Sequence, residues 1–107
     1  MLEDTKHFTV EYMDNRISLY AAQYGKCAVT GKHLSKDEIH CHHKTPKCYG
    51  GDDRYENLVI VHSDVHILIH AKTQETIEKY MCIVQPTKEQ LKKLNKLRAL
   101  ARLPEIL

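Results

Sequence analysis

The chain has 107 residues, of which 42% are hydrophobic and 28% are charged, and its formal net charge is +2. This length predicts one domain with a small core, and this composition excludes a disordered chain. No apolar run approaches the ~18 residues that a membrane-spanning helix needs, so we expect no membrane partner.

The first predicted elements precede a histidine-rich segment. We expect a helix over about residues 14–25, with Asp14 as its N-cap and Ile17 among its packed side chains. The stretch KCAVTGKHL is typical of a tight turn with Gly31 as its hinge. The stretch EIHCHH that follows predicts a short strand.

A loop, a second strand and a helix come next. The stretch TPKCYGGDDRYEN predicts a loop, because Pro46 disfavours helix before it and Gly50-Gly51 permits a turn. The run LVIV (58–61) is apolar and rich in β-branched residues, which is typical of a buried strand. The stretch SDVHILIHA then predicts a helix with Ser63 as its N-cap.

Two further helices are expected over about residues 74–84 and 88–102. Thr73 is expected to cap the first, and Pro86 separates the two. Thr87 begins the second with a Thr-x-x-Gln capping box. The apolar stripe of this last helix, which we expect to face the core, consists of Leu91, Leu94, Leu97 and Ala101.

Basic residues are concentrated in this last helix. From Pro86 onward the chain has six basic and two acidic residues, whereas the remainder has ten basic and twelve acidic residues. A positive segment suits the phosphate backbone of a nucleic acid, and a solvated helix face is the open alternative.

The compartment is predicted from the N-terminus and the cysteines. The stretch MLEDTKHFTVEY is mixed and acidic and has no signal-peptide core, which predicts a cytoplasmic protein. The cysteines are therefore expected to be thiols or metal ligands rather than disulfides: Cys27, Cys41, Cys48 and Cys82.

Histidine is the outlier of the composition, with eight residues, and five side chains recur at a suggestive spacing. The pattern is His42-His43-x13-Asn57-x8-His66-x3-His70. His66 and His70 are four residues apart on a predicted helix, so they share a face and can bind one cation. A hairpin packed on that helix could add His42, while His43, pointing to the opposite side of its strand, could face a water molecule. Each residue alone has an ordinary structural explanation, but together they favour a site.

Residues 40–70, HCHHKTPKCYGGDDRYENLVIVHSDVHILIH, resemble the HNH endonuclease motif, a ββα-metal fold. The wider stretch NRISLYAAQYGKCAVTGKHL…CHHKTPKCYGGDDRYENLVIVHSDVHILIHA is similar to the C-terminal endonuclease domain of bacterial group II intron reverse transcriptase/maturases. The resemblance implies an α+β fold, with one HNH domain over residues 1–107. Its ββα core would span about residues 38–72, with helices flanking it on both sides.

The resemblance also implies a role for each matched residue. His43 resembles the general base that deprotonates the attacking water, and Asn57 resembles the asparagine that braces the loop carrying that base. His42 and His66 resemble metal ligands, and His70 matches a third ligand that only some members use. The implied cofactor is one divalent ion, with Mg²⁺ favoured by cellular abundance and Mn²⁺, Ni²⁺ or Zn²⁺ as alternatives.

The implied activity is metal-dependent hydrolysis of DNA phosphodiester bonds, by nicking one strand of a target as in group II intron mobility. The basic residues expected to contact phosphates are Lys44, Lys47, Arg54, Lys92 and Lys96. Intron RNA and reverse transcriptase domains would be partners if the chain is a fragment. Two other interpretations stay open: a metal-stabilised DNA-binding module that has lost catalysis, and a stand-alone phage or toxin-type HNH nuclease.

The sequence departs from the four-cysteine zinc knuckle of many HNH domains. It keeps Cys27 but has Thr30 at the second position, and His62 and Val65 stand where the second pair would fall. Threonine and valine cannot replace thiolates, so we expect no intact structural zinc and favour small buried side chains for Cys27, Cys41 and Cys48. His40 and His62 fall outside the core motif and are expected to be structural or phosphate-facing.

Overall fold

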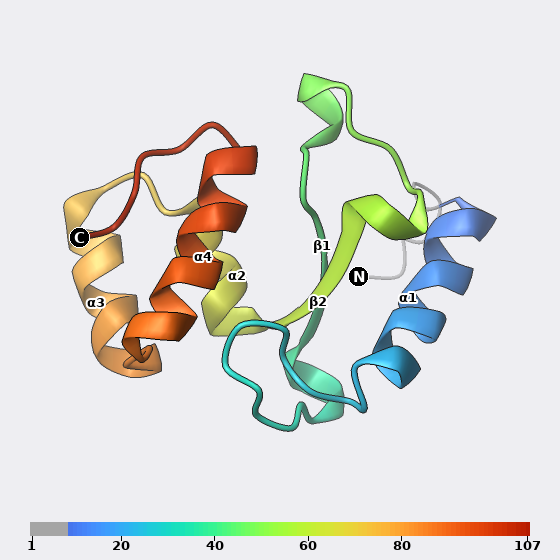
Figure 1. Ribbon diagram of the computed structural model, residues 1–107, viewed down its shortest axis with the longest axis horizontal. Helices are drawn as coiled ribbons and strands as arrows, with labels where there is room; N and C mark the ends of the chain where they lie inside the picture. The colour runs from blue at the N-terminus through green and yellow to red at the C-terminus, as the bar shows by residue number, and fades with distance from the viewer. Residues whose placement is uncertain (1–8) are drawn as a thin grey trace.

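A β-hairpin stands between one helix on one side and three helices on the other (Figure 1). The computed structural model describes residues 9–107 of this α+β chain. Residues 1–8 lie outside the described residues. They form most of the N-terminal stretch from which the sequence predicts that there is no signal peptide. Within residues 9–107, no helix is long and apolar enough to cross a membrane.

The order of elements agrees with the predicted order. The helices are α1 (Val10–Ala22), α2 (Ser63–His70), α3 (Gln74–Val84) and α4 (Lys88–Leu100). The strands are β1 (Ile39–His43) and β2 (Leu58–His62), and short 3₁₀ turns cover Lys36–Glu38, Lys47–Tyr49 and Tyr55–Asn57. The two strands, α3 and the start of α4 lie where the sequence predicts them, and α4 ends two residues early.

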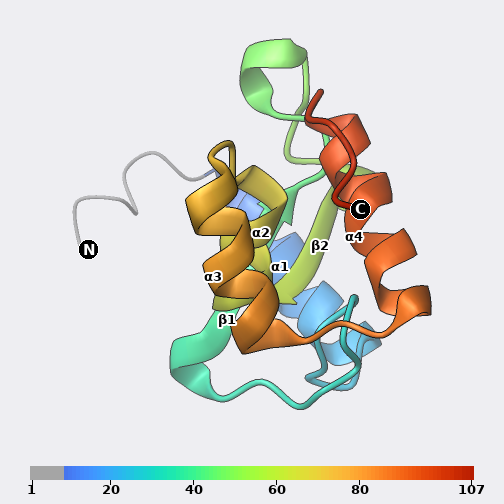
Figure 2. The same cartoon turned by 90° about the vertical axis from the view of Figure 1, so that its left-hand side faces the viewer.

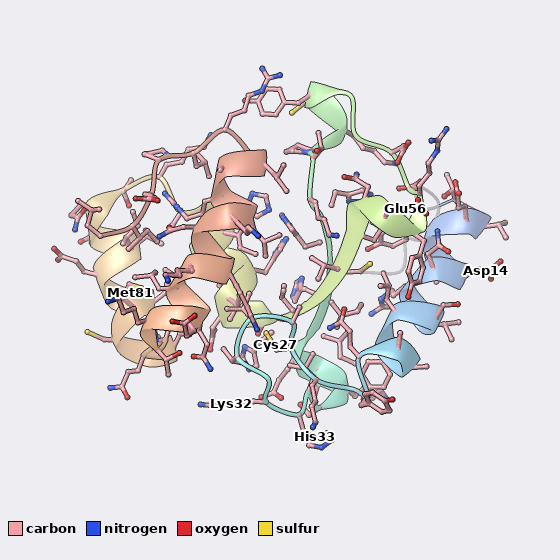
Figure 3. The ribbon with its side chains drawn as sticks, viewed as in Figure 1. Asp14, Cys27, Lys32, His33, Glu56 and Met81 are labelled. Atoms are coloured by element: carbon pink, nitrogen blue, oxygen red, sulfur yellow. The ribbon has the colours of Figure 1, made fainter. Side chains whose placement is uncertain are left out.

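Helix α1 begins one turn before the predicted start. Thr9 is its N-cap, because the Thr9 hydroxyl accepts a hydrogen bond from the backbone N–H of Tyr12 at 2.9 Å. Asp14, the expected cap, lies inside the helix on its outer side (Figure 3). The prediction that Ile17 packs against the core is also wrong, since Ile17 is 70% exposed. The extra turn instead places Tyr12 on the buried face, together with Leu19.

Helix α2 is capped by His62 rather than by Ser63. The His62 Nδ1 accepts a hydrogen bond from the backbone N–H of Asp64 at 2.9 Å, and its Nε2 lies 3.2 Å from Glu38 Oε2. Strand β2 passes into α2 without a loop, so the last residue of the strand occupies the cap position. His62 therefore has a structural role, which is one of the two that the sequence left open for it.

The hairpin is antiparallel, with a register that runs from the pair Ile39–His62 to the pair His43–Leu58. The side chain of Gln23, which follows α1, acts as an extra partner for β2. Its Oε1 accepts from the backbone N–H of Ile60 at 3.1 Å, and its Nε2 donates to the Ile60 carbonyl at 3.0 Å. These bonds attach α1 to the hairpin and satisfy backbone groups of β2.

Helix α2 lies against the hairpin, with α3 and α4 packed on its other sides (Figure 2). The predicted caps of the last two helices are confirmed: the Thr73 hydroxyl accepts from the backbone of Thr76, and Thr87 forms a capping box with Gln90. The predicted apolar stripe of α4 is confirmed as well. Leu94, Leu97 and Ala101 are buried and Leu91 is partly buried.

All four cysteines are free thiols. Cys27 is buried near the point where β2 passes into α2 (Figure 3), and its Sγ accepts from the backbone N–H of His62 at 3.3 Å. Cys41 is partly buried, whereas Cys48 and Cys82 are exposed, so burial of Cys48 is a wrong expectation. Among residues 9–107, no cysteine belongs to a group that could hold a metal ion.

Candidate metal centre

Three histidines from two elements converge beside the hairpin. His42 comes from β1, and His66 and His70 come from α2. Their ligand nitrogen atoms lie within 4.8 Å of one another, close enough to hold one metal ion. The juxtaposition arises as predicted, because His66 and His70 share a helix face and the hairpin packs His42 against it.

The imidazole of His42 is the deepest of the three. It is 1% exposed, and its Nε2 has no hydrogen-bond partner among residues 9–107. Burial, together with the positive charge that His66 and His70 would carry if protonated, lowers the pKa of His42 to about 3. The ring is therefore neutral near pH 7, with a buried nitrogen that lacks the partner such atoms ordinarily have.

His66 is partly buried, and His70 is exposed. Burial, with the neighbouring His70 and His40 as further causes, lowers the pKa of His66 to about 4. Burial, followed by the charges of Lys72 and Arg98, also lowers the pKa of His70. All three imidazoles are thus held in the neutral form that ligates a metal.

The donor set suits a divalent cation with an open position. Imidazole nitrogens bind zinc, nickel and related ions, and sites with three protein ligands leave room for water or substrate. A hollow beside the cluster is lined by His66 and His70 and also by Lys72 and Thr73. The exposed side of the cluster therefore opens to solvent next to a lysine, which favours an anionic ligand.

His40 also belongs to this face of the hairpin. Its ring stacks on His66, with ring centroids 4.9 Å apart and an interplanar angle of 17°. The alternation of β1 explains this, since His40 and His42 point to the same side of the strand. His40 lies outside the metal-ligand group and supports the orientation of one of its members.

His43 faces the opposite side of β1 and meets a carboxylate. Its Nε2 lies 2.7 Å from Asp53 Oδ1, and its ring stacks on Tyr12 with centroids 5.3 Å apart. His43 is 24% exposed and Asp53 is 6% exposed. The two adjacent histidines thus have different surroundings, as the alternation of the strand predicts.

Asp53 is fixed from three directions besides His43. Its Oδ2 accepts from the Thr9 hydroxyl at 2.7 Å and lies 3.1 Å from Lys47 Nζ. Its backbone carbonyl accepts from Asn15 Nδ2 at 2.9 Å. Burial opposes ionisation of this carboxyl group, but the hydrogen bonds from His43, Thr9 and Lys47 outweigh it and lower its pKa to about 2.

Asn57 braces the loop between the strands. Its Oδ1 accepts from the backbone N–H of Thr45 at 2.9 Å, and its Nδ2 donates to the carbonyls of Thr45 and Asp52 at 3.1 and 2.8 Å. A Cβ at Gly51 would collide with the Thr45 carbonyl, so the close approach of the two chain segments requires glycine there. The side chain of Asn57 therefore shapes the segment that leads from His43 to Asp53.

The basic residues expected to contact phosphates lie in two places. In the loop, Lys47 pairs with Asp53, and Arg54 Nε lies 3.3 Å from Asp52 Oδ2. On α4, Lys92 and Lys96 line a separate hollow with Glu89, which lies 3.9 Å from Lys92. Lys44, at the start of the loop, is partly buried and donates its backbone N–H to the Asn57 carbonyl at 2.7 Å.

Four residues near the histidines have contacts that no motif in the sequence indicates. These are Tyr12, Asp53, Lys72 and Arg98. Asp53 is visible as an acidic residue in the Gly-Gly loop, but its contact with His43 depends on the conformation of that loop.

No protein-family model, no curated protein and no solved structure matches the chain.

Proposed function

We propose that this protein is a metal-dependent HNH endonuclease that hydrolyses DNA phosphodiester bonds and nicks one strand. In this proposal the hairpin and α2 form the ββα-metal core, with His42, His66 and His70 as the ligands of one divalent ion. The observation that carries the proposal is the buried Nε2 of His42, which lacks a partner in residues 9–107 and lies beside two further imidazoles.

The chain's own residues divide the work of hydrolysis. His43 would accept the proton of the attacking water, since a neutral imidazole is a workable base near pH 7. Asn57 would hold the segment that follows His43, through its three hydrogen bonds to the loop backbone. When bound, the divalent ion would stabilise negative charge on the phosphate and on the departing 3′-oxygen.

Positive side chains near the cluster support a phosphate substrate. Lys72 lines the hollow beside His66 and His70. Lys44, Arg54 and the exposed lysines of α4 would contact phosphates farther along the duplex, which sets position rather than sequence.

The test is supercoiled plasmid incubated with the purified chain and Mg²⁺, Mn²⁺, Ni²⁺ or Zn²⁺, or with EDTA. We expect open circles that require metal and that disappear for His43→Ala and His42→Ala. His33→Ala is the matched control, because His33 is an exposed histidine outside the cluster. Metal-independent nicking, or full activity of His43→Ala, would sink the proposal.

A chain that binds DNA without cutting it would favour the alternative of a binding module that has lost catalysis. A gel shift on the same samples measures this, in low and moderate salt. If the chain belongs to an intron-encoded protein, then adding intron RNA and the reverse transcriptase domains would restore cutting. A stand-alone nuclease would cut without them.

A further inference from the structure

The contact between His43 and Asp53 specifies how the imidazole is protonated. Asp53 Oδ1 lies 2.7 Å from Nε2 of His43, and Asp53 is 6% exposed. An ionised carboxylate only accepts hydrogen bonds, so the hydrogen in this contact must be on Nε2. A neutral His43 ring then has its lone pair on the other nitrogen, Nδ1.

The remaining contacts of Asp53 keep it ionised and leave one oxygen for His43. The Thr9 hydroxyl and Lys47 Nζ both approach Oδ2, at 2.7 and 3.1 Å. These donors lower the pKa of Asp53 to about 2 in spite of its burial, so the group is a carboxylate throughout the neutral range. Oδ1 accordingly serves as the acceptor for His43.

Both partners are fixed against rotation. The ring of His43 stacks on Tyr12 at an interplanar angle of 12°. Thr9 is the N-cap of α1, so the hydroxyl that holds Asp53 also accepts from the backbone N–H of Tyr12 at 2.9 Å. Helix α1 therefore positions the acid, through Thr9 and Asn15, and the imidazole, through Tyr12.

We infer that Asp53 is a positioning residue that holds His43 as the Nε2–H tautomer, so that Nδ1 is the nitrogen that takes the proton from water. The part of this inference that concerns water rests on the proposed function. The assignment of the tautomer does not, because it follows from the contacts of Asp53 alone. Asp53 would act through His43, and it lies outside the three-histidine group.

The direct test is the ¹⁵N spectrum of the His43 ring in the wild-type chain, recorded at a pH where the imidazole is neutral. We expect a pyrrole-type signal for Nε2 and a pyridine-type signal for Nδ1. The opposite assignment, or averaged shifts that report a mixture of tautomers, would overturn the inference. This measurement uses the wild-type chain, so it depends neither on nuclease activity nor on the folding of a variant.

The kinetic test compares Asp53→Asn with the wild type in plasmid nicking. We expect the maximal rate to fall by about 10²–10⁴-fold, the range contributed by a correctly placed general base, with little change in KM. The double variant His43→Ala/Asp53→Asn should be no slower than His43→Ala, because Asp53 acts through His43. A wild-type rate for Asp53→Asn would contradict the inference.

Asp52→Asn is the matched control, since Asp52 is the neighbouring carboxylate and pairs with Arg54 on the surface. It should keep the wild-type rate and tautomer. Zn²⁺ affinity of Asp53→Asn should equal that of the wild type, because the three-histidine group lies on the other side of β1. If the wild type does not nick DNA but His43 is protonated on Nε2, the proposed function fails and the tautomer assignment stands.

Discussion

Arg98 Nη1 lies 2.7 Å from the carbonyl oxygen of Leu68, so the last helix of the chain caps the helix that carries His66 and His70. The same nitrogen donates to the Ala71 carbonyl at 2.9 Å, and Nε donates to the Pro104 carbonyl at 2.8 Å. Arg98 is 1% exposed, and burial lowers its pKa. Carbonyls at the end of α2 thus accept hydrogen bonds from a side chain outside the hairpin and α2.

We expect Arg98→Lys to destabilise the fold although it keeps the charge. A lysine cannot reproduce the planar fork that reaches the carbonyls on both sides, so at least one of them loses its partner. The cost should be about 2–3 kcal/mol in the free energy of unfolding, as for other buried groups left without partners. Urea denaturation measures it, with the exposed Lys93→Met as control. A wild-type midpoint for Arg98→Lys would show that capping of α2 is unimportant.

Gly51→Ala tests the close approach inside the loop between the strands. A Cβ added at Gly51 would collide with the Thr45 carbonyl and would lie 3.0 Å from Asn57 Nδ2, so the loop must open. We expect a loss of more than about 2 kcal/mol of stability. Gly50→Ala is the matched comparison, because Gly50 has a positive φ of 92° but no neighbour within 4 Å. Its cost should be the ~1 kcal/mol of a left-handed backbone conformation. Equal costs in the two variants would contradict this account.

The three-histidine group could be predicted from the sequence because two simple periodicities determine it. His66 and His70 share a face of any helix, and His42 and His43 point to opposite sides of any strand. The caps of α3 and α4 could also be predicted, since Thr73 and Thr87 have no competing cap nearby. The His66–His70 pair and these caps depend on neighbours within four residues, whereas His42 joins the group through the packing of the hairpin on α2.

Features that depend on distant parts of the chain could not be predicted. Asp53 reaches His43 only because Gly51 and Asn57 give the loop its conformation. The start of α1 depends on Thr9, whose hydroxyl bonds to Asp53 as well as to its own helix. Both Asp14 and Thr9 are residue types that cap helices well. Thr9 is the cap in the structure, and its hydroxyl also bonds to Asp53, which lies 44 residues away in the sequence.

His42→Ala should abolish tight metal binding, because it removes the buried ligand of the group. Isothermal titration with Zn²⁺ or Ni²⁺ should show at least a 10²-fold weaker affinity, whereas His33→Ala should bind as the wild type does. Saturating metal should also raise the melting temperature of the wild type, because an ion that binds only the folded chain stabilises it. The gain in the free energy of unfolding is about 2.7 kcal/mol when the free metal concentration is a hundred times Kd. Unchanged affinity in His42→Ala would place the metal elsewhere.

The stability of the metal-free chain should fall as the pH falls, in two overlapping windows. The pKa of His42 is about 3 and that of His66 is about 4 in the fold, against 6.5 for an ordinary histidine. The unfolded chain therefore binds more protons than the folded chain between about pH 6.5 and 3, and stability decreases as the pH decreases through this window.

Asp53 governs the lower window, because its pKa is about 2 in the fold and 3.8 ordinarily. The stabilisation from its ionised form is complete above about pH 4 and is lost as the pH falls towards 2. Urea denaturation at a series of pH values should show that His42→Leu flattens the upper window, with a maximal change in slope of about 1.4 kcal/mol per pH unit. Asp53→Asn should flatten only the lower one. If His42→Leu left the slope between pH 6.5 and 4 unchanged, the buried imidazole would not be neutral in the folded chain.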